Sequence, residues 1–204
     1  MSRKELKERA KTQLGGSIFS QNWLYAVLAV VVVAVIMGVV GIIPAIGSAV
    51  IIIISGAIEV GLAYVFLKQA RDGQKMNMAD IFKGFTDDFK GSFLLGLMST
   101  IFIILWSLLF IIPGIIKSFA YSMAFYIKND HPEYNWKQCI DESQRIMNGH
   151  KWELFVLNLS FIGWAIVGGL CLGVGTFWVY AYINATTVQF YESIKESGVA
   201  EVVE

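Results

Sequence analysis

The stretch FIIPGIIKSF, residues 110–119, decides how this chain is threaded. It places Pro113 and Gly114 inside an apolar run that extends from residue 93 to residue 127, with Lys117 shortly after the turn signal. As one helix this run would be about 50 Å long, which exceeds a hydrocarbon core of about 30 Å. The run is therefore either one kinked helix or two helices that reverse at Pro113.

The composition is typical of an integral membrane protein. Hydrophobic residues make up 56% of the chain, charged residues 16%, and the mean hydropathy is +0.60, whereas soluble domains have about 25% charged residues. Three stretches contain no charged side chain, namely residues 23–58, 92–116 and 154–191. Each is long enough to cross a bilayer as a helix.

The positions of lysine and arginine favour the reversal at Pro113. Basic residues concentrate in the cytoplasmic loops of membrane proteins. With a reversal, the five basic residues before the first span, five in the first connector, four in the second and one in the tail all lie on one side. A kink would place the last five of them on the opposite side. We therefore predict three helical hairpins with both termini in the cytoplasm.

The predicted fold is an all-α membrane protein, one domain over residues 1–204, with six transmembrane helices and cytoplasmic amphipathic helices. The first and third hairpins turn at residues 42–47 and 172–175. The predicted segments are a cytoplasmic N-terminus at 1–22, hairpins at 23–67, 92–127 and 152–191, connectors at 68–91 and 128–151, and a tail at 192–204.

Three polar segments have an apolar stripe at helical spacing. The second follows Asn77, and the third follows Asn135, which with Gln138 is typical of a helix start. Such helices either lie in the membrane interface with the stripe toward lipid or pack beneath the helical bundle, and both interpretations stay open. The stripes are Leu6, Ala10 and Leu14; Met78, Phe82, Phe85 and Phe89; and Trp136, Ile140, Ser143 and Met147.

Four polar residues interrupt the apolar spans and form the candidate intramembrane site: Glu59, Lys117, Asn158 and Asn184. A charge inside a membrane is costly and marks a partner or a pathway. Glu59 and Lys117 lie at depths where they could pair across two hairpins. The alternatives are a coupling-ion or substrate site, a structural pair, or two separately satisfied residues.

The sequence contains no recognisable catalytic, cofactor or metal motif. We therefore expect no enzyme activity, cofactor or metal site, and Cys139 and Cys171 are expected to be free thiols. Membrane lipids are the expected partners, together with other membrane proteins or a second copy, and nucleic acid is not expected. The candidate interfacial lipid contacts are Trp23, Trp136, His150, Lys151 and Trp152.

Several stretches resemble the bacterial membrane family catalogued as domain of unknown function 975. They include GLAYVFLK at 61–68, IFKGF at 81–85, LWSLLFIIPGIIKSFAYSMAFYI at 105–127 and SQRIMNGHKWELFVLNLSFIGW at 143–164. The resemblance covers nearly the whole chain. It implies a protein of the bacterial cytoplasmic membrane, with no activity or ligand to carry over.

Three functional hypotheses follow from these observations. The first is a non-enzymatic scaffold, or a modulator of lipids or partner proteins, that works at the cytoplasmic side. The second is a small transporter or channel with a polar path through the four intramembrane residues. The third is a lipid-modifying enzyme that would use His150, Lys151, Glu153 and Arg145.

Overall fold

The computed structural model describes residues 1–43, 47–73, 75–170 and 173–200. Throughout these ranges the ordered elements are helices, and no strand occurs in them. The chain divides into two compact units: unit 1 comprises Met1–Val35, Val65–Met78 and Trp152–Glu204, and unit 2 comprises Ile36–Tyr64 and Ala79–Lys151. The boundary falls inside helices α2 and α3, so both helices continue from one unit into the other.

Four helical segments are long and apolar enough to cross a membrane. In the last of them, α9 (Lys151–Leu159) and α10 (Ile162–Leu170) are separated by a short break. Few residues of these segments are buried except in α3, which is consistent with helices that meet lipid rather than water. The segments are α2 (Gln21–Gly41), Ala49–Asp72 within α3 (Gly47–Asp72), α5 (Phe89–Leu109) and Lys151–Leu170.

The other two predicted spans correspond to shorter or more polar helices. Residues 111–130 form α6 (Ile111–Tyr121) and α7 (Ala124–Asp130), and the last predicted span lies in α11 (Gly175–Ala200). With 11 residues, α6 is about 16 Å long, roughly half of a hydrocarbon core. The arrangement of six spans in three hairpins therefore stays a prediction.

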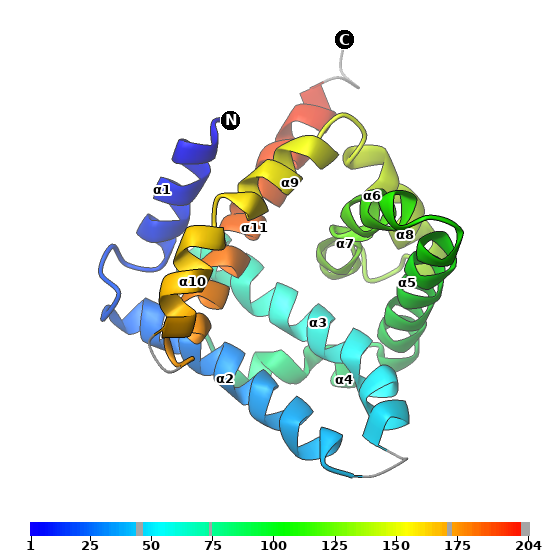
Figure 1. Cartoon of the computed structure of the whole chain (residues 1–204), viewed down its shortest axis with the longest axis horizontal. Coiled ribbons are helices and arrows are strands. Elements are labelled where there is room, and N and C mark those ends of the chain that lie inside the picture. The colour runs from blue at the N-terminus through cyan, green and yellow to red at the C-terminus, as the bar shows by residue number, and fades with distance from the viewer. Residues whose placement is uncertain (44–46, 74, 171–172, 201–204) are drawn as a thin grey trace. The chain divides into compact units, whose positions relative to one another are not determined.

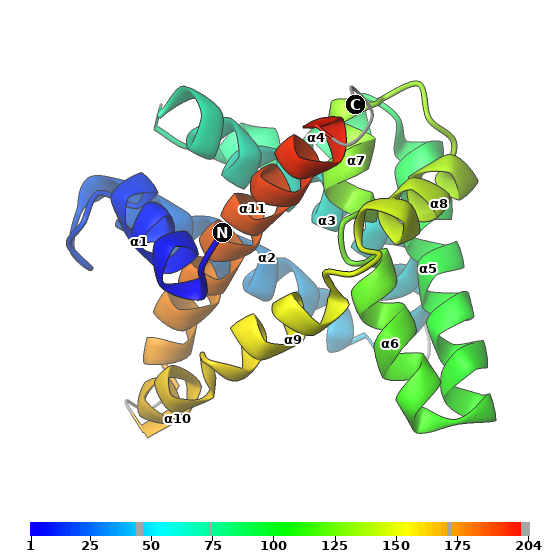
Figure 2. The same ribbon diagram turned by 90° about the horizontal axis from the view of Figure 1, so that it is seen from above.

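The chain reverses between α5 and α6, three residues before Pro113. Phe110 is extended, with φ −158° and ψ 139°, and its N–H closes α5 by donating to the Trp106 carbonyl. Ser107 and Gly114 then lie against each other, and α5 and α6 run side by side (Figure 2). Pro113 occupies the first turn of α6, where its missing N–H leaves no bond unmade. The predicted reversal is present, but Phe110 makes it rather than Pro113 and Gly114.

Unit 1 brings the start and the end of the chain together. Leu6, Ala10 and Leu14 of the first predicted stripe are almost completely buried along α1 (Arg3–Gln13), which packs on α11 (Figure 1). Helices α10 and α11 touch through their backbones, because a Cβ atom on Gly168 would lie 3.0 Å from the Gly175 carbonyl carbon. This close contact makes them a tight helical pair.

Unit 2 is packed around glycines of α3. A Cβ atom on Gly96 of α5 would lie 2.6 Å from the Gly56 Cα atom, and a Cβ atom on Gly61 would overlap the Ile81 carbonyl group. Ile81 belongs to the 3₁₀ helix η1 (Met78–Phe82), which is followed by α4 (Lys83–Thr86). Glycine is therefore required where α3 meets its neighbours backbone to backbone.

The second predicted stripe is arranged differently from expectation. The segment is a 3₁₀ helix followed by one α turn, and it buries Ile81 and Gly84 rather than the phenylalanines. Phe82 and Phe89 are 44% and 40% exposed. Together with two neighbours they form an aromatic ladder, in which consecutive ring centroids lie 5.6–6.3 Å apart: Phe82, Phe85, Phe89 and Phe93.

The third stripe agrees with its sequence pattern. Helix α8 (Trp136–Ile146) begins with a capping box, in which Asn135 accepts from the Gln138 N–H and the Gln138 side chain accepts from the Asn135 N–H. Ile140, Ser143 and Met147 are buried against α5, α6 and α7. This amphipathic helix packs under a helical bundle, the second of the two interpretations given above.

Some predicted features lie outside the described residues. They are Pro44, Ala45 and Ile46 in the first predicted turn, Cys171, and Leu172 in the third.

Candidate functional site

Unit 1 contains an apolar groove with a volume of about 510 Å³. Volumes of this size are typical of small-molecule sites, which are mostly apolar with a few polar groups. We call it the tryptophan groove, because three tryptophans belong to its walls. Its lining residues are Lys11, Gly16, Ile18, Phe19, Trp23, Trp164, Val167, Gly168, Val174, Gly175, Trp178, Val179 and Tyr182.

The groove walls are held in place by aromatic and backbone contacts. Trp178 donates its indole N–H to the Ile18 carbonyl at 3.1 Å, which fixes the loop after α1 to α11. The rings of Trp23 and Tyr182 lie 5.6 Å apart, and the Tyr182 hydroxyl donates to the Lys7 carbonyl at 3.2 Å. These contacts connect α1, α2 and α11, so the floor of the groove is built from both ends of the sequence.

The rim of the groove is exposed although it is apolar. Phe19 is 73% exposed, Trp164 57% and Val167 55%. Such a concentration of exposed apolar side chains marks a surface that meets lipid or a partner. The Trp23 indole N–H in the wall is buried and has no hydrogen-bond partner among the described residues.

Positive charge is concentrated beside the groove. Helix α1 carries five basic and two acidic residues, and Lys11 is the one charged side chain in the described lining. Lys7 donates to the Ser160 carbonyl at 3.2 Å and lies 4.0 Å from the centre of the Phe161 ring. Burial, together with the positive charges of Lys11 and Arg3, lowers the pKa of the Lys7 ammonium.

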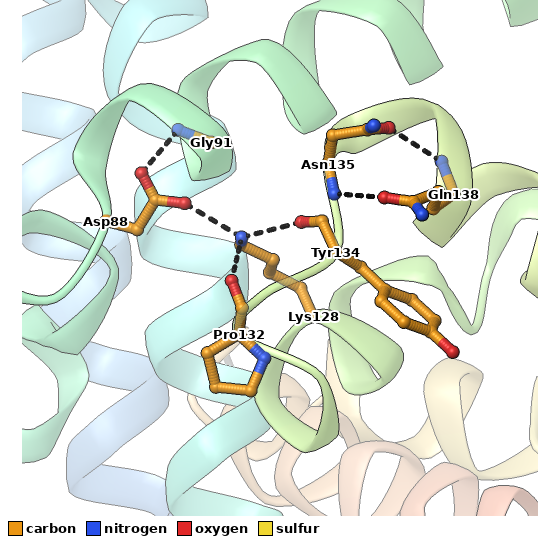
Figure 3. A network of polar contacts seen from close by, with 7 residues as sticks. All are labelled: Asp88, Gly91, Lys128, Pro132, Tyr134, Asn135 and Gln138. Carbon is orange, nitrogen blue, oxygen red and sulfur yellow. Dashed lines mark hydrogen bonds and ion pairs between the residues drawn. The ribbon is translucent and has the colours of Figure 1, made fainter.

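A second cluster, in unit 2, surrounds the buried Lys128 ammonium (Figure 3). Its Nζ atom lies 2.8 Å from Asp88 Oδ2, 2.8 Å from the Pro132 carbonyl and 2.9 Å from the Tyr134 carbonyl. The Lys128 side chain is only 5% exposed. An ammonium has three donors, so these three oxygens satisfy it completely. We therefore interpret this cluster as a structural clamp and not as a ligand site.

Asp88 connects this clamp to the start of α5. Its second carboxylate oxygen accepts from the Gly91 N–H at 2.9 Å and so caps the helix (Figure 3). The hydrogen bond from Lys128, followed by the bond from Gly91, lowers the pKa of the Asp88 carboxyl group. A side chain at Gly91 would overlap Asp88, which explains the glycine at this position.

The structure gives Lys117 a partner other than Glu59. Lys117 donates to the Gln144 side chain at 2.8 Å and lies 5.2 Å from the centre of the Trp106 ring and 5.7 Å from that of Tyr121. Such ring contacts stabilise a cation. Glu59 lies on the exposed side of α3, with no hydrogen bond or ion pair to any residue described. Lys117 therefore has polar and aromatic partners without Glu59, and the structure does not pair the two residues.

The two asparagines of the predicted intramembrane site lie in unit 1. Asn184 donates to the Tyr180 carbonyl of its own helix at 2.9 Å, and Asn158 is half-buried on α9. The structure thus places Glu59 and Lys117 in unit 2 and the two asparagines in unit 1.

The predicted interfacial contacts occupy different environments. Trp23 is 5% exposed and lines the tryptophan groove, whereas Trp152 is 70% exposed. Trp136 is half-buried, 6.2 Å from the Phe102 ring, and His150 and Lys151 are half-buried where α8 gives way to α9. Of these five residues, Trp23 alone belongs to the groove.

The candidate site for lipid-modifying chemistry lacks a free arginine. Arg145 donates two hydrogen bonds to Glu142, at 2.8 and 2.6 Å. No cluster of three or more residues able to bind a metal occurs in the described part of the chain.

Sequence reasoning missed most of the tryptophan groove. In the sequence, Trp164, Val167 and Trp178 have only the pattern of apolar span residues. Their spacing does not distinguish a groove wall from a lipid-facing surface, because the groove exists only after α1 and α2 pack against α11. The presence of a tryptophan on either side of the 172–175 break, Trp164 and Trp178, was the one available signal.

The described part of the chain defines a class of protein, namely a helical protein with four segments able to cross a membrane. A comparison with models of protein families matches residues 1–118 and 108–198 to the family described as "Protein of unknown function (DUF975)". The chain therefore belongs to this family. No curated protein and no solved structure matches it.

Proposed function

We propose that this protein is a multi-pass protein of the bacterial cytoplasmic membrane that binds lipid and acts as a non-enzymatic scaffold or modulator. Both termini face the cytoplasm in this proposal. The four apolar segments support it. The basic residues of the termini and connectors support it as well, because they all lie on one side when the chain forms the six predicted spans. Further support comes from Phe82 and Phe89, the two exposed rings of the aromatic ladder, because exposed aromatic side chains are common where a protein meets the membrane interface.

The tryptophan groove is the observation that carries the lipid-binding part. It is open, apolar and lined by three tryptophans, and it lies beside a basic amphipathic helix. A lipid offers an acyl chain for such a groove and a polar headgroup for such a helix. The clamp around Lys128 borders a pocket of only about 90 Å³, and the donors of its ammonium are already occupied.

Native mass spectrometry of gently extracted protein tests lipid binding. We expect wild-type protein to retain one lipid and Val167→Trp to lose it, because the indole fills the groove. Each displaced methylene contributes about 0.8 kcal/mol, so the bound fraction should fall at least about tenfold.

The neighbouring variant Ile166→Trp is the matched control. Ile166 is 60% exposed on the same helix, close to the 55% of Val167, but it does not line the groove. Lipid retention should therefore be unchanged in this variant. Equal retention in both variants, or wild-type protein free of lipid, would contradict the proposal.

Transport is a second candidate function, favoured by one observation. Glu59 is a carboxylate in a segment apolar enough to cross a membrane, without a partner among the described side chains, and such residues mark ion pathways. If Glu59 carries an ion, Glu59→Gln should reduce flux in proteoliposomes at least about tenfold, whereas Glu59→Asp keeps the carboxylate and retains flux. Equal flux in wild type and Glu59→Gln, at equal thermal stability, would exclude this role.

A further inference from the structure

We infer that the tryptophan groove selects an anionic phospholipid, with one acyl chain along Trp23, Trp164 and Trp178 and the phosphate at Lys11. This inference rests on the proposed function and names the ligand class of the same site. It draws on the shape of the groove, on the distribution of charge along α1 and on the weak pairing of Lys11.

The apolar part of the groove fits a hydrocarbon chain better than a polar ligand. Its wall offers the faces and edges of three indoles and the side chains of Val167 and Val179. Two of the three indole N–H groups are buried or occupied: Trp178 binds the Ile18 carbonyl and Trp23 is enclosed. A ligand here therefore gains mainly by burying apolar surface.

The charge at the groove is positive and only weakly neutralised. Lys11 pairs with Glu8 at 3.3 Å, but their side chains are 44% and 60% exposed, and exposed pairs of this kind contribute little. Lys11 is therefore available to a phosphate. A phosphate accepts hydrogen bonds from an ammonium more strongly than neutral acceptors do.

Lys7 adds positive charge that its own contacts do not cancel. Its Nζ atom is held by the Ser160 carbonyl and the Phe161 ring, neither of which carries a full negative charge. The pKa of Lys7 is lowered by burial and then by Lys11 and Arg3, which is the expected response to crowded positive charge. An anion bound near Lys11 would relieve this repulsion.

The positive charge at Lys11 also favours an anionic lipid over a second copy of this chain as the occupant of the groove. A second copy of this chain would have to bring an acidic, apolar segment to Lys11, but the long apolar stretches carry no acidic residue apart from Glu59. An anionic phospholipid combines a negative headgroup with an acyl chain in one molecule. Its charge and its chain thus match both parts of the site.

Competition between phosphatidylglycerol and phosphatidylcholine, followed by native mass spectrometry on delipidated full-length protein, tests the inference. Wild-type protein should prefer phosphatidylglycerol several-fold. Lys11→Gln should reduce this preference about fivefold, the effect of one basic residue near a lipid phosphate. Lys4→Gln, an exposed α1 residue outside the groove lining, is the matched control and should leave the preference unchanged.

The outcomes separate this inference from the proposed function. Equal binding of both lipids that Val167→Trp abolishes would overturn the anionic preference and leave lipid binding intact. The same would follow if Lys4→Gln and Lys11→Gln reduced the preference equally. Binding of neither lipid, or of a second protein chain in place of lipid, would overturn both.

Discussion

Lys128 is an ammonium that the fold has removed from water and surrounded by oxygen atoms. A buried charge is tolerated only when its partners replace the lost hydration. Two main-chain carbonyls and the Asp88 carboxylate do so at 2.8–2.9 Å. The sequence indicated a basic residue after a membrane span, but not this clamp, because two of the three acceptors are backbone groups of the following loop.

Asp88 should give the protein a measurable pH dependence. The folded state lowers the pKa of this carboxyl group, chiefly through the Lys128 hydrogen bond, while an unfolded aspartate titrates near about 3.9. Folding is therefore stabilised above about pH 4, and this contribution is lost as the pH falls through the lowered folded pKa. The Asp88 side chain is 43% exposed but the Lys128 side chain is only 5% exposed, so we expect Asp88→Asn, which leaves a buried ammonium without its carboxylate, to cost about 2 kcal/mol at neutral pH.

Thermal unfolding in detergent, followed by circular dichroism between about pH 3 and about pH 7, measures this effect. Wild type should lose more stability toward low pH than Asp88→Asn does. Asp87→Asn is the control, since its carboxylate pairs with Lys83 at 3.4 Å and is 59% exposed. An acid response of Asp88→Asn as steep as that of wild type would show that the carboxylate contributes nothing.

Lys117 shows what residue-level reasoning could and could not predict. Its position inside an apolar run indicates a residue that needs a partner. The partner is Gln144, 27 residues away on an amphipathic helix. The depth of a residue along a helix can be read from the sequence, whereas the direction that its side chain faces depends on packing. Depth alone therefore suggested Glu59 as the partner of Lys117, and packing places Gln144 there instead.

At the scale of elements, local signals were the reliable ones. The capping box at Asn135 and Gln138 involves atoms three residues apart, and α8 begins there as predicted. The segment from Met78 to Phe89 has equally good helical spacing, yet it becomes η1, α4 and the first residue of α5, with Phe82 and Phe89 exposed. Gly61 allows the buried position of Ile81, because a glycine in α3 lets the Ile81 backbone pack directly against the helix backbone.

Alanine substitutions at two glycines, one in close contact and one in open space, should change the free energy of unfolding in opposite directions. Gly61→Ala should lower the free energy of unfolding by about 3 kcal/mol, because the new methyl group overlaps the Ile81 carbonyl. Gly38→Ala on α2 has nothing within 4 Å of the new Cβ atom, so the better helix propensity of alanine should raise stability by about 0.5–1 kcal/mol. Both free energies can be measured by denaturant titration in mixed micelles. A Gly61→Ala variant as stable as wild type, or more stable, would refute the close contact of Gly61 with Ile81.

At the scale of the whole molecule, hydropathy predicted a helical protein with segments able to cross a membrane, whereas the number of six crossings stays a prediction. The apolar runs correspond to four segments that meet the requirements for crossing, while α6 and α7 break the fourth predicted span at Ser122 and Met123. Composition reports how much surface needs lipid. It does not report whether a short helix such as α6 crosses the bilayer or leans on its neighbours.

Cysteine labelling in intact cells tests the predicted sidedness. In a background without Cys139 and Cys171, we expect a cysteine at Lys137 to resist a membrane-impermeant maleimide, because the 128–151 connector is predicted to be cytoplasmic. A cysteine at Ile42, which is 79% exposed near the first predicted outer turn, should react. Labelling at position 137 in unbroken cells would disprove the arrangement of three hairpins.

The pairing of α1 with α11 has a consequence for biosynthesis. Domains usually complete their folding in the order in which the ribosome delivers them. Here residues 36–64 and 79–151 can form unit 2 while α1, already made, still waits for α11 to cover Leu6 and Ala10. A nascent chain stalled before α11 would therefore expose its amphipathic N-terminus, and that segment is the one a chaperone or protease would meet first.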